Sequence, residues 1–161
     1  MKVIKNFLNK KTHKRMCDII FGNNFPLFYQ NVVGGKKDKS DYMFTHIFYH
    51  LNRENSDYYK DIIKPLLNNI EFTELIRAKL NFYTRKPNHI QTAYHVDYPK
   101  DKHTVALYSI NTNNGYTLFK NGSRVKSIAN QLLLFDGRLK HCSVNQTDKR
   151  VRVNININLR T

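Results

Sequence analysis

The C-terminal half of the chain contains two stretches in which apolar and polar residues alternate strictly. A period of two predicts β-strands whose apolar side is packed against a core. The polar positions of the first stretch are Arg77, Lys79, Asn81 and Tyr83. Those of the second stretch are Arg150, Arg152, Asn154, Asn156 and Asn158. Periodicity alone leaves open whether these polar faces meet solvent or line a ligand cavity.

The rest of the pattern predicts short strands joined by turns, with two helices before them. Helical spacing of apolar residues predicts a helix over residues 10–20 and another over residues 56–69, where Pro65 indicates a kink or an early end. Further strands are expected at residues 25–33, 42–51, 104–110, 116–120, 124–128, 132–135 and 141–145, and a charged loop at residues 34–40. This order predicts a mainly β fold, with a double-sheet, barrel-like core and N-terminal helices packed on one side.

The chain length of 161 residues, 40% of them hydrophobic, is typical of one globular domain. We expect a single domain over residues 1–161, in which residues 1–75 give helical and extended support and residues 76–161 form the core with the site. No apolar run approaches the ~20 residues of a membrane helix, and the N-terminus has no secretory-signal pattern. Two cysteines favour a reducing compartment. The prediction is a cytoplasmic protein with no membrane partner.

The formal net charge of +15 favours anionic partners, such as nucleic acid, acidic protein or phosphorylated metabolites. The alternative is a solvated basic surface, because the charges are scattered along the chain rather than gathered in blocks. No recognised nucleic-acid-binding motif accompanies the charge. Composition therefore leaves both interpretations open.

The functional prediction depends on the segment Tyr94-His95-Val96-Asp97-Tyr98. In an extended segment, His95 and Asp97 point to the same side. With His141 as a second imidazole, they would make two histidines and one carboxylate, the ligand set typical of non-haem Fe(II) oxygenases. The alternative is that both histidines are hydrogen-bonded structural residues of a β-barrel.

From about residue 76 to residue 159, the chain resembles the Fe(II)/2-oxoglutarate-dependent dioxygenases, most closely the prolyl-4-hydroxylase-like group, which includes small viral or phage members. The family pattern is His-X-Asp, then a distal histidine, then a basic residue. Here these are His95-Val96-Asp97, His141 and Arg150. Also similar are Gly115-Tyr116-Thr117-Leu118-Phe119, Asn130-Gln131-Leu132-Leu133-Leu134-Phe135-Asp136 and Tyr83. The N-terminal half carries little specific likeness.

The resemblance implies a double-stranded β-helix (jelly-roll) core that holds Fe(II) on His95, Asp97 and His141. It also implies 2-oxoglutarate as cosubstrate, dioxygen as oxidant and ascorbate as a supporting reductant. Arg150 is expected to bind the remote carboxylate of 2-oxoglutarate, and Arg152, on the same face, is the alternative. Tyr83 is expected to add a hydrogen bond. Tyr108 is a further candidate, unless alternation makes Ser109 the residue that faces inward.

The implied reaction is hydroxylation of a peptidyl prolyl residue, with release of succinate and CO2. We expect a peptide or another anionic macromolecule as substrate, contacted by Tyr94, Tyr98 and Arg85, although these residues also fit an exposed loop. The alternatives are a nucleic-acid-directed oxygenase, a non-catalytic basic β-barrel that binds nucleic acid, and a cupin-like metal protein with another cosubstrate or none. The likeness to viral and phage members implies a virus-encoded protein that acts in a host cell.

Overall fold

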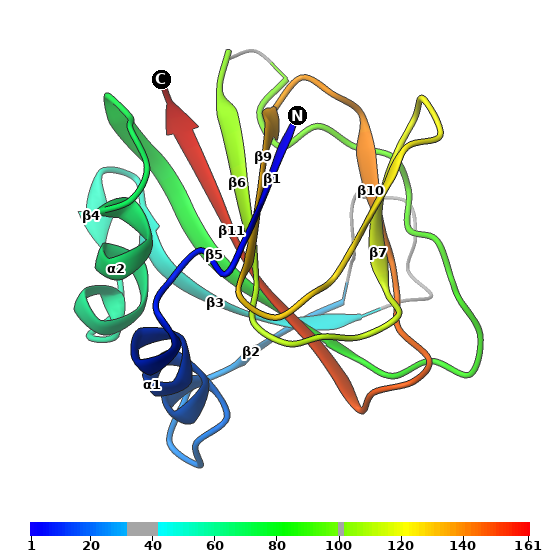
Figure 1. Cartoon of the computed structure of the whole chain (residues 1–161), viewed down its shortest axis with the longest axis horizontal. Helices are drawn as coiled ribbons and strands as arrows, with labels where there is room; N and C mark the ends of the chain where they lie inside the picture. The colour runs from blue at the N-terminus through cyan, green and yellow to red at the C-terminus, as the bar shows by residue number, and fades with distance from the viewer. Residues whose placement is uncertain (32–41, 100–101) are drawn as a thin grey trace.

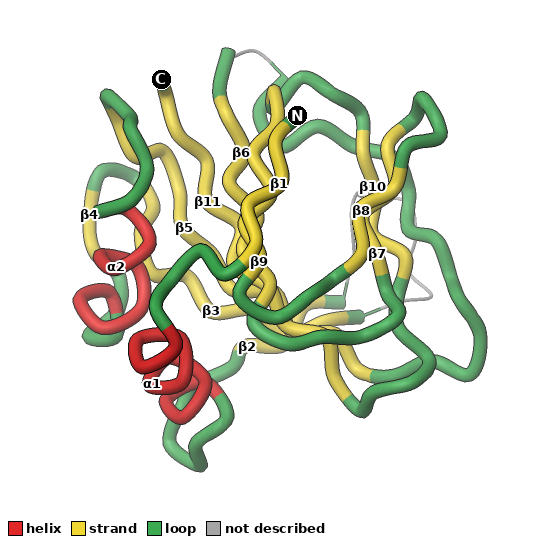
Figure 2. Tube along the Cα trace, in the orientation of Figure 1, coloured by secondary structure: helices red, strands yellow, loops and turns green. Residues whose placement is uncertain are grey.

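The structure is a computed structural model, and it describes residues 1–31, 42–99 and 102–161. The charged loop predicted at residues 34–40 lies outside these described residues. Two antiparallel sheets face each other, and the helices cover the outer side of the larger sheet (Figures 1 and 2). This is the mainly β, jelly-roll-type arrangement with helices on one side that the sequence predicts.

Within the described residues, the larger sheet has the strand order β1-β9-β6-β11-β5-β3-β2, with β4 paired to β3. Its strands are β1 (Lys2–Lys5), β2 (Phe28–Gln30), β3 (Met43–His50), β4 (Arg53–Glu54), β5 (Glu74–Thr84), β6 (Thr104–Ser109), β9 (Gln131–Asp136) and β11 (Val151–Arg160). The smaller sheet has the order β10-β7-β8, formed by β7 (Tyr116–Phe119), β8 (Arg124–Lys126) and β10 (His141–Val144). The N-terminal part of the chain thus contributes strands to the larger sheet as well as helices.

The helices are short and lie where apolar spacing predicts them. Helix α1 (Lys10–Ile20) is capped by Asn9, whose side chain accepts a hydrogen bond from the backbone N–H of Thr12 at 2.9 Å. The second helical segment is a π-helical turn, η1 (Tyr59–Ile63), continued by α2 (Lys64–Leu67), and it is shorter than predicted. In the described part of the chain, no helix is long and apolar enough to cross a lipid bilayer.

The main core lies between the helices and the larger sheet. It includes Met16 and Ile20 of α1, Ile62 and Ile63 of η1, Leu66 of α2, and Leu80, Ile155 and Ile157 of the sheet, all buried. A second, smaller cluster between the two sheets consists of Val105, Phe119, Leu133 and Phe135. Burial of apolar surface on both sides of the larger sheet is what holds the two sheets and the helices together.

Strand β11 lies at the centre of the larger sheet, paired with β5 on one side and β6 on the other. Its apolar residues face the helices. Its polar residues face the smaller sheet and are also buried, with exposed fractions of at most 8% from Arg152 to Asn158. Polar side chains that are buried along a whole strand need partners or a cavity. The open question about the polar faces is therefore answered for most of their length, because the polar residues from Arg77 to Tyr83 and from Arg152 to Asn156 line a cavity between the sheets.

Candidate active site

A cavity of about 290 Å³ lies between the two sheets. Alternate residues of two paired strands form its floor, with Arg77, Lys79, Asn81 and Tyr83 from β5 and Arg152, Asn154 and Asn156 from β11. The segment that contains His95 and Asp97, together with β10, forms the opposite wall. The cavity is at the small end of the range for ligand sites and is unusually polar.

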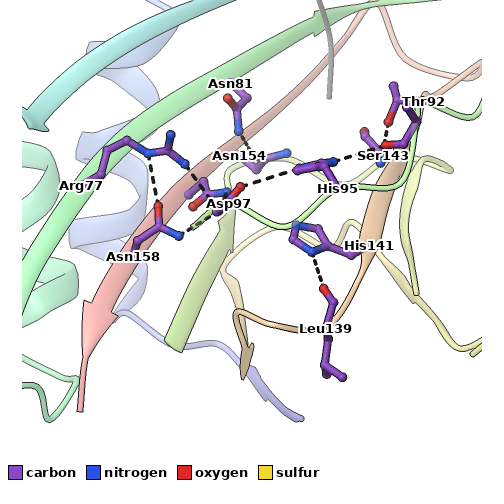
Figure 3. A network of polar contacts seen from close by, with 12 residues as sticks. Arg77, Asn81, Thr92, His95, Asp97, Leu139, His141, Ser143, Asn154 and Asn158 are labelled. Atoms are coloured by element: carbon purple, nitrogen blue, oxygen red, sulfur yellow. Dashed lines mark hydrogen bonds and ion pairs between the residues drawn. The ribbon is translucent and has the colours of Figure 1, made fainter. Parts of the chain in front are cut away.

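The three predicted metal ligands meet in this cavity. The backbones of His95 and His141 exchange two hydrogen bonds, of 2.9 and 3.1 Å, which bring the two rings to a centroid distance of 4.6 Å. Asp97 follows two residues after His95, and its Oδ1 lies 3.7 Å from His95 Nε2 (Figure 3). One ligand atom from each residue lies within 4.8 Å of the others. The sequence prediction that these side chains converge is confirmed by this geometry.

Both imidazoles present the same nitrogen to the cavity. The Nδ1 of His141 donates to the backbone carbonyl of Leu139 at 2.9 Å, and the Nδ1 of His95 donates to that of Ala93 at 3.3 Å. A carbonyl can only accept, so Nδ1 carries the proton and Nε2 keeps its lone pair. Such backbone partners commonly fix the orientation of metal-ligating histidines.

Asp97 is held by one of its two oxygens. Its Oδ2 accepts hydrogen bonds from the amides of Asn158 at 2.8 Å and Asn156 at 3.0 Å, and it lies 3.4 Å from the guanidinium of Arg77. Arg77 Nε also donates to Asn158 Oδ1 at 3.2 Å, so the group forms a closed network (Figure 3). Three anchors on Oδ2 leave Oδ1, the oxygen beside His95, available to a metal.

The electrostatics keep Asp97 and His141 in the protonation states that a metal requires. Burial would raise the pKa of Asp97, but Arg77 and the two asparagine amides outweigh it and lower that pKa to about 2. Burial lowers the pKa of His141, although its bond to the carbonyl of Leu139 opposes the shift. The carboxylate is therefore charged and this imidazole neutral near pH 7. Two imidazole nitrogens and one carboxylate oxygen suit a non-haem ferrous ion.

Arg152 lies at the other end of the cavity floor and is fully buried. Its Nε donates to Ser127 Oγ at 2.8 Å, another nitrogen donates to Ser143 Oγ, and the guanidinium lies 5.3 Å from the ring centroid of Tyr83. Burial lowers its pKa. Among the described residues, no carboxylate lies within ion-pair distance of Arg152. A buried guanidinium without a counter-ion is costly, which indicates a site for an anionic ligand.

The preference for Arg150 over Arg152 is wrong on geometry. Arg150 lies in the turn just before β11, is exposed, and does not line the cavity, whereas Arg152 is the first cavity-facing residue of the strand. Arg150 and Arg152 are two residues apart, so alternation places both on the same face and the sequence could not distinguish between them. The position at which β11 begins decides between them.

The two tyrosines expected near the cosubstrate lie on opposite sides of the larger sheet. Tyr83 lines the cavity opposite Arg152, and its hydrogen bond to the cosubstrate remains a prediction. Tyr108 does not line the cavity: it is buried in the main core, where its hydroxyl donates to Asn130 Oδ1 at 2.8 Å and contacts His13 Nδ1 at 2.7 Å. The expectation of a ligand-facing Tyr108 is therefore wrong, because α1 and the Asn130 turn supply its polar partners.

Gly115 lies directly beside the stem of Arg152. A Cβ at this position would be 2.9 Å from Arg152 Cδ and 2.9 Å from Asn113 Oδ1. Neither contact is tolerable for a real Cβ, so a residue without a side chain is required for the arginine to lie where it does.

The three residues expected to contact substrate lie outside the cavity lining. Tyr94 and Arg85 are exposed. Tyr98 has the Cζ of Arg77 5.2 Å from its ring centroid, and its ring centroid lies 5.6 Å from that of His103. Tyr94 and Tyr98 nevertheless flank the segment that carries His95 and Asp97. Their contact with substrate remains a prediction.

A larger groove of about 1030 Å³ lies over β2, β3 and β4, on another part of the surface. It contains His46, whose two ring nitrogens already contact the carbonyl of Pro26 at 2.8 Å and Ser56 Oγ at 2.7 Å. No metal-ligand group other than His95, Asp97 and His141 occurs in the part of the chain that the structure describes. The smaller cavity is therefore the candidate active site, despite its size.

Sequence reasoning missed the residues that support the site, namely Arg77, Asn156 and Asn158 around Asp97, and Ser127 and Ser143 around Arg152. A signal for the first group was present, since three asparagines in alternate positions of a central strand are unusual for a core. The serines carry no such signal, because only the folded chain brings them to Arg152.

Comparison with known proteins adds support for the fold. No protein-family model matches the sequence, and no curated protein matches it. Solved structures do match: a Pseudomonas putida prolyl-4-hydroxylase has a TM-score of 0.61 at 11% identity, over 99% of this chain and 92% of that one. A Trichoplax adhaerens prolyl hydroxylase, in complex with a hypoxia inducible factor oxygen degradation domain peptide fragment, has a TM-score of 0.61 at 16% identity, over 98% of this chain and 82% of that one.

A third similar structure is SnoN, a non-haem α-ketoglutarate-dependent epimerase from nogalamycin biosynthesis. It has a TM-score of 0.64 at 12% identity, over 98% of this chain and 76% of that one. The similarity spans nearly the whole chain in all three cases, including the N-terminal half that shows little likeness in sequence. The chain therefore has the prolyl-4-hydroxylase-like fold found in 2-oxoglutarate (α-ketoglutarate)-dependent oxygenases.

Proposed function

We propose that this protein is an Fe(II)- and 2-oxoglutarate-dependent oxygenase that hydroxylates its substrate. The observation that carries the proposal is the pairing of two features in one cavity. A two-histidine, one-carboxylate group lies at one end, and a buried Arg152, with no counter-ion among the described residues, lies at the other. A dianion such as 2-oxoglutarate offers one end to a metal and the other to a guanidinium. The fold of the similar structures supports the same chemistry.

His95, Asp97 and His141 would hold the ferrous ion through their Nε2, Oδ1 and Nε2 atoms. Three ligands leave the remaining positions of an octahedral ion open to other molecules. When bound, the ion supplies the oxidising chemistry by which dioxygen and 2-oxoglutarate yield succinate, CO2 and one hydroxyl group on the substrate. The contribution of the chain is to keep Asp97 charged and anchored through Oδ2, and to keep the imidazoles oriented by backbone carbonyls.

Arg152 would bind the far carboxylate of 2-oxoglutarate. Ser127 and Ser143 occupy two of its nitrogens, and the N–H groups that they leave are the donors for a charge-assisted pair. Tyr83 packs against the guanidinium and borders the same space. Because Arg152 is already fixed by packing and hydrogen bonds, little further ordering is needed when the ligand binds.

For the substrate, we propose a peptide, with a prolyl residue as the hydroxylated group. Two similar structures are a prolyl-4-hydroxylase and a prolyl hydroxylase with a bound peptide, which supports this choice. The similarity to an epimerase indicates that the same fold carries out other reactions. The net charge of +15 supports a second candidate, an oxygenase that acts on nucleic acid.

The test is succinate release from 2-oxoglutarate with Fe(II) and dioxygen present, over a panel of proline peptides, matched alanine peptides and oligonucleotides. We expect 2-oxoglutarate turnover that is stimulated by the proline peptides and abolished in Asp97→Ala. Stimulation by oligonucleotides alone would favour the second candidate. Folded protein that produces no succinate with any of them, and is indistinguishable from Asp97→Ala, would contradict the proposed activity.

A further inference from the structure

Besides Arg77 and Arg152, the cavity is lined by a third cation, Lys79, which the proposed binding of metal and cosubstrate does not use. Lys79 is on β5, on the same face as Arg77 and Tyr83, and lies opposite Asn156 of β11 on one side and Ile47 of β3 on the other. It is four residues from Tyr83, the cross-strand partner of Arg152. At the rise of a β-strand this separates the two positions by ~13 Å. Lys79 therefore lies beside the metal end of the cavity, away from the Arg152 end.

Lys79 has no hydrogen-bond or ion-pair partner among the described residues. The carboxylate that influences Lys79 electrostatically is that of Asp97. This carboxylate is already in contact with Arg77 and two asparagine amides. Burial, reinforced by Arg77, lowers the pKa of Lys79 to about 8, although Asp97 opposes the shift. A partly buried ammonium that faces a cavity and has no counter-ion among the described residues is a receptor for an anionic group.

Two acceptors without donors flank this ammonium. The side-chain oxygens of Asn81, two residues along β5, and Asn156, opposite on β11, are buried and lack a hydrogen-bond partner in the described part of the chain. Such oxygens repel an oxyanion but match N–H groups. A phosphate group would place several negatively charged oxygens near these side-chain carbonyls, and the repulsion would exceed the attraction of one ammonium. A carboxylate next to an N–H donor complements both features.

We propose that Lys79, Asn81 and Asn156 form a substrate subsite, the Lys79 subsite, which binds a carboxylate that has N–H groups beside it. This chemistry occurs in an acidic residue of a peptide and in a free acidic amino acid. The inference rests on the proposed function, because it places the substrate next to the same metal group. It narrows the substrate class to acidic compounds, with the carboxylate on the ammonium and the N–H groups on the two asparagines.

The test is equilibrium binding by calorimetry to the full chain loaded with Mn(II) and 2-oxoglutarate under argon, so that no turnover occurs. The probes are a proline peptide with one glutamate, the same peptide with glutamine, free glutamate and a short oligonucleotide. We expect the glutamate peptide or free glutamate to bind about tenfold or more tightly than the glutamine peptide, as for a charge-assisted hydrogen bond. Which of the two binds better separates a peptide substrate from an amino acid.

Three variants assign the effect. Lys79→Met should abolish the preference for glutamate, Lys79→Arg should retain most of it, and Lys126→Met, which removes the same charge from the exposed strand β8, should leave it unchanged. No preference in the wild type, a preference that survives in Lys79→Met, or Lys79-dependent binding of the oligonucleotide alone would overturn the inference.

The affinity for 2-oxoglutarate separates this failure from failure of the proposed function. Lys79→Met should bind Mn(II) and 2-oxoglutarate as the wild type does. If the variant instead weakens 2-oxoglutarate binding and leaves peptide binding unchanged, Lys79 serves the cosubstrate and the subsite is wrong, while the proposed function stands. If the wild type binds neither metal nor 2-oxoglutarate, the proposed function itself fails.

Discussion

The two ends of the cavity each have a buried or partly buried arginine, and the two arginines are used differently. Arg77 lies 3.4 Å from Asp97 and donates to Asn158, so its charge is balanced inside the protein. Arg152 has serine hydroxyls and a tyrosine ring around it and, among the described residues, no carboxylate. A buried cation whose charge is balanced inside the protein thus positions other groups, whereas a buried cation left unbalanced marks a binding site for an anionic ligand.

The largest effect is expected from removing the unbalanced charge of Arg152. In Arg152→Met, the dissociation constant of 2-oxoglutarate should rise on the order of 10²-fold or more, because truncating one partner of a buried charge pair costs about 2–5 kcal/mol. Isothermal titration with Mn(II)-loaded protein measures this change. Arg150→Met is the matched control and should bind 2-oxoglutarate as the wild type does. The reverse pattern would restore Arg150 as the cosubstrate residue.

Removing the balanced charge should affect the metal instead. In Arg77→Met, the Oδ2 of Asp97 loses its cationic partner, and we expect Mn(II) affinity to fall about 10- to 100-fold, as is usual for residues that support metal ligands. Electron paramagnetic resonance of free Mn(II) gives the dissociation constant. Arg53→Met, an exposed change on β4, is the control. Unchanged Mn(II) affinity in Arg77→Met would show that Arg77 does not position Asp97.

A smaller effect is expected from a substitution next to Arg152. Gly115→Ala places a methyl group 2.9 Å from Arg152 Cδ, so the arginine must shift. Overpacking of this kind costs about 1–3 kcal/mol, and we expect 2-oxoglutarate to bind about tenfold more weakly. Mn(II) affinity should not change, because the metal ligands are elsewhere. If both affinities fell together, the effect would be general unfolding rather than displacement of Arg152.

A further prediction concerns pH and Lys79. Its pKa in the folded protein is about 8, below the ordinary value of 10.5. Between these values the unfolded chain binds a proton that the folded chain does not, so this residue makes stability increase with pH. Relative to Lys79→Met, the wild type should gain unfolding free energy as pH rises from about 8 to about 10.5, measured by urea denaturation. A constant difference across this range would mean that Lys79 is solvated.

Much of the fold could be predicted from local pattern. Helix α1 begins and ends at the predicted residues because its apolar spacing and the Asn9 cap agree. The alternation in β11 was equally clear. By contrast, β1 was not predicted, since its four residues contain two lysines and its strand forms only through pairing with β9. Local pattern carries no information about such a distant partner.

The site was predictable only as far as residue type and spacing determine it. The His95, Asp97 and His141 group was found because a strand places alternate residues on one side. The two predictions that were wrong concerned Arg150, chosen over Arg152 on the same face, and Tyr108, chosen over its neighbour Ser109. They depended on where a strand starts and on which partners the other elements supply, and three-dimensional packing decides both.

Anaerobic addition of Fe(II) and 2-oxoglutarate tests whether one cavity binds both, because the spectroscopic signal requires the metal ligands and the cosubstrate site in the same protein. We expect a weak visible charge-transfer band in the wild type, its loss in Asp97→Ala, and its appearance only at much higher 2-oxoglutarate concentration in Arg152→Met. Correctly folded wild-type protein that shows no such band at saturating Fe(II) and 2-oxoglutarate would contradict the account.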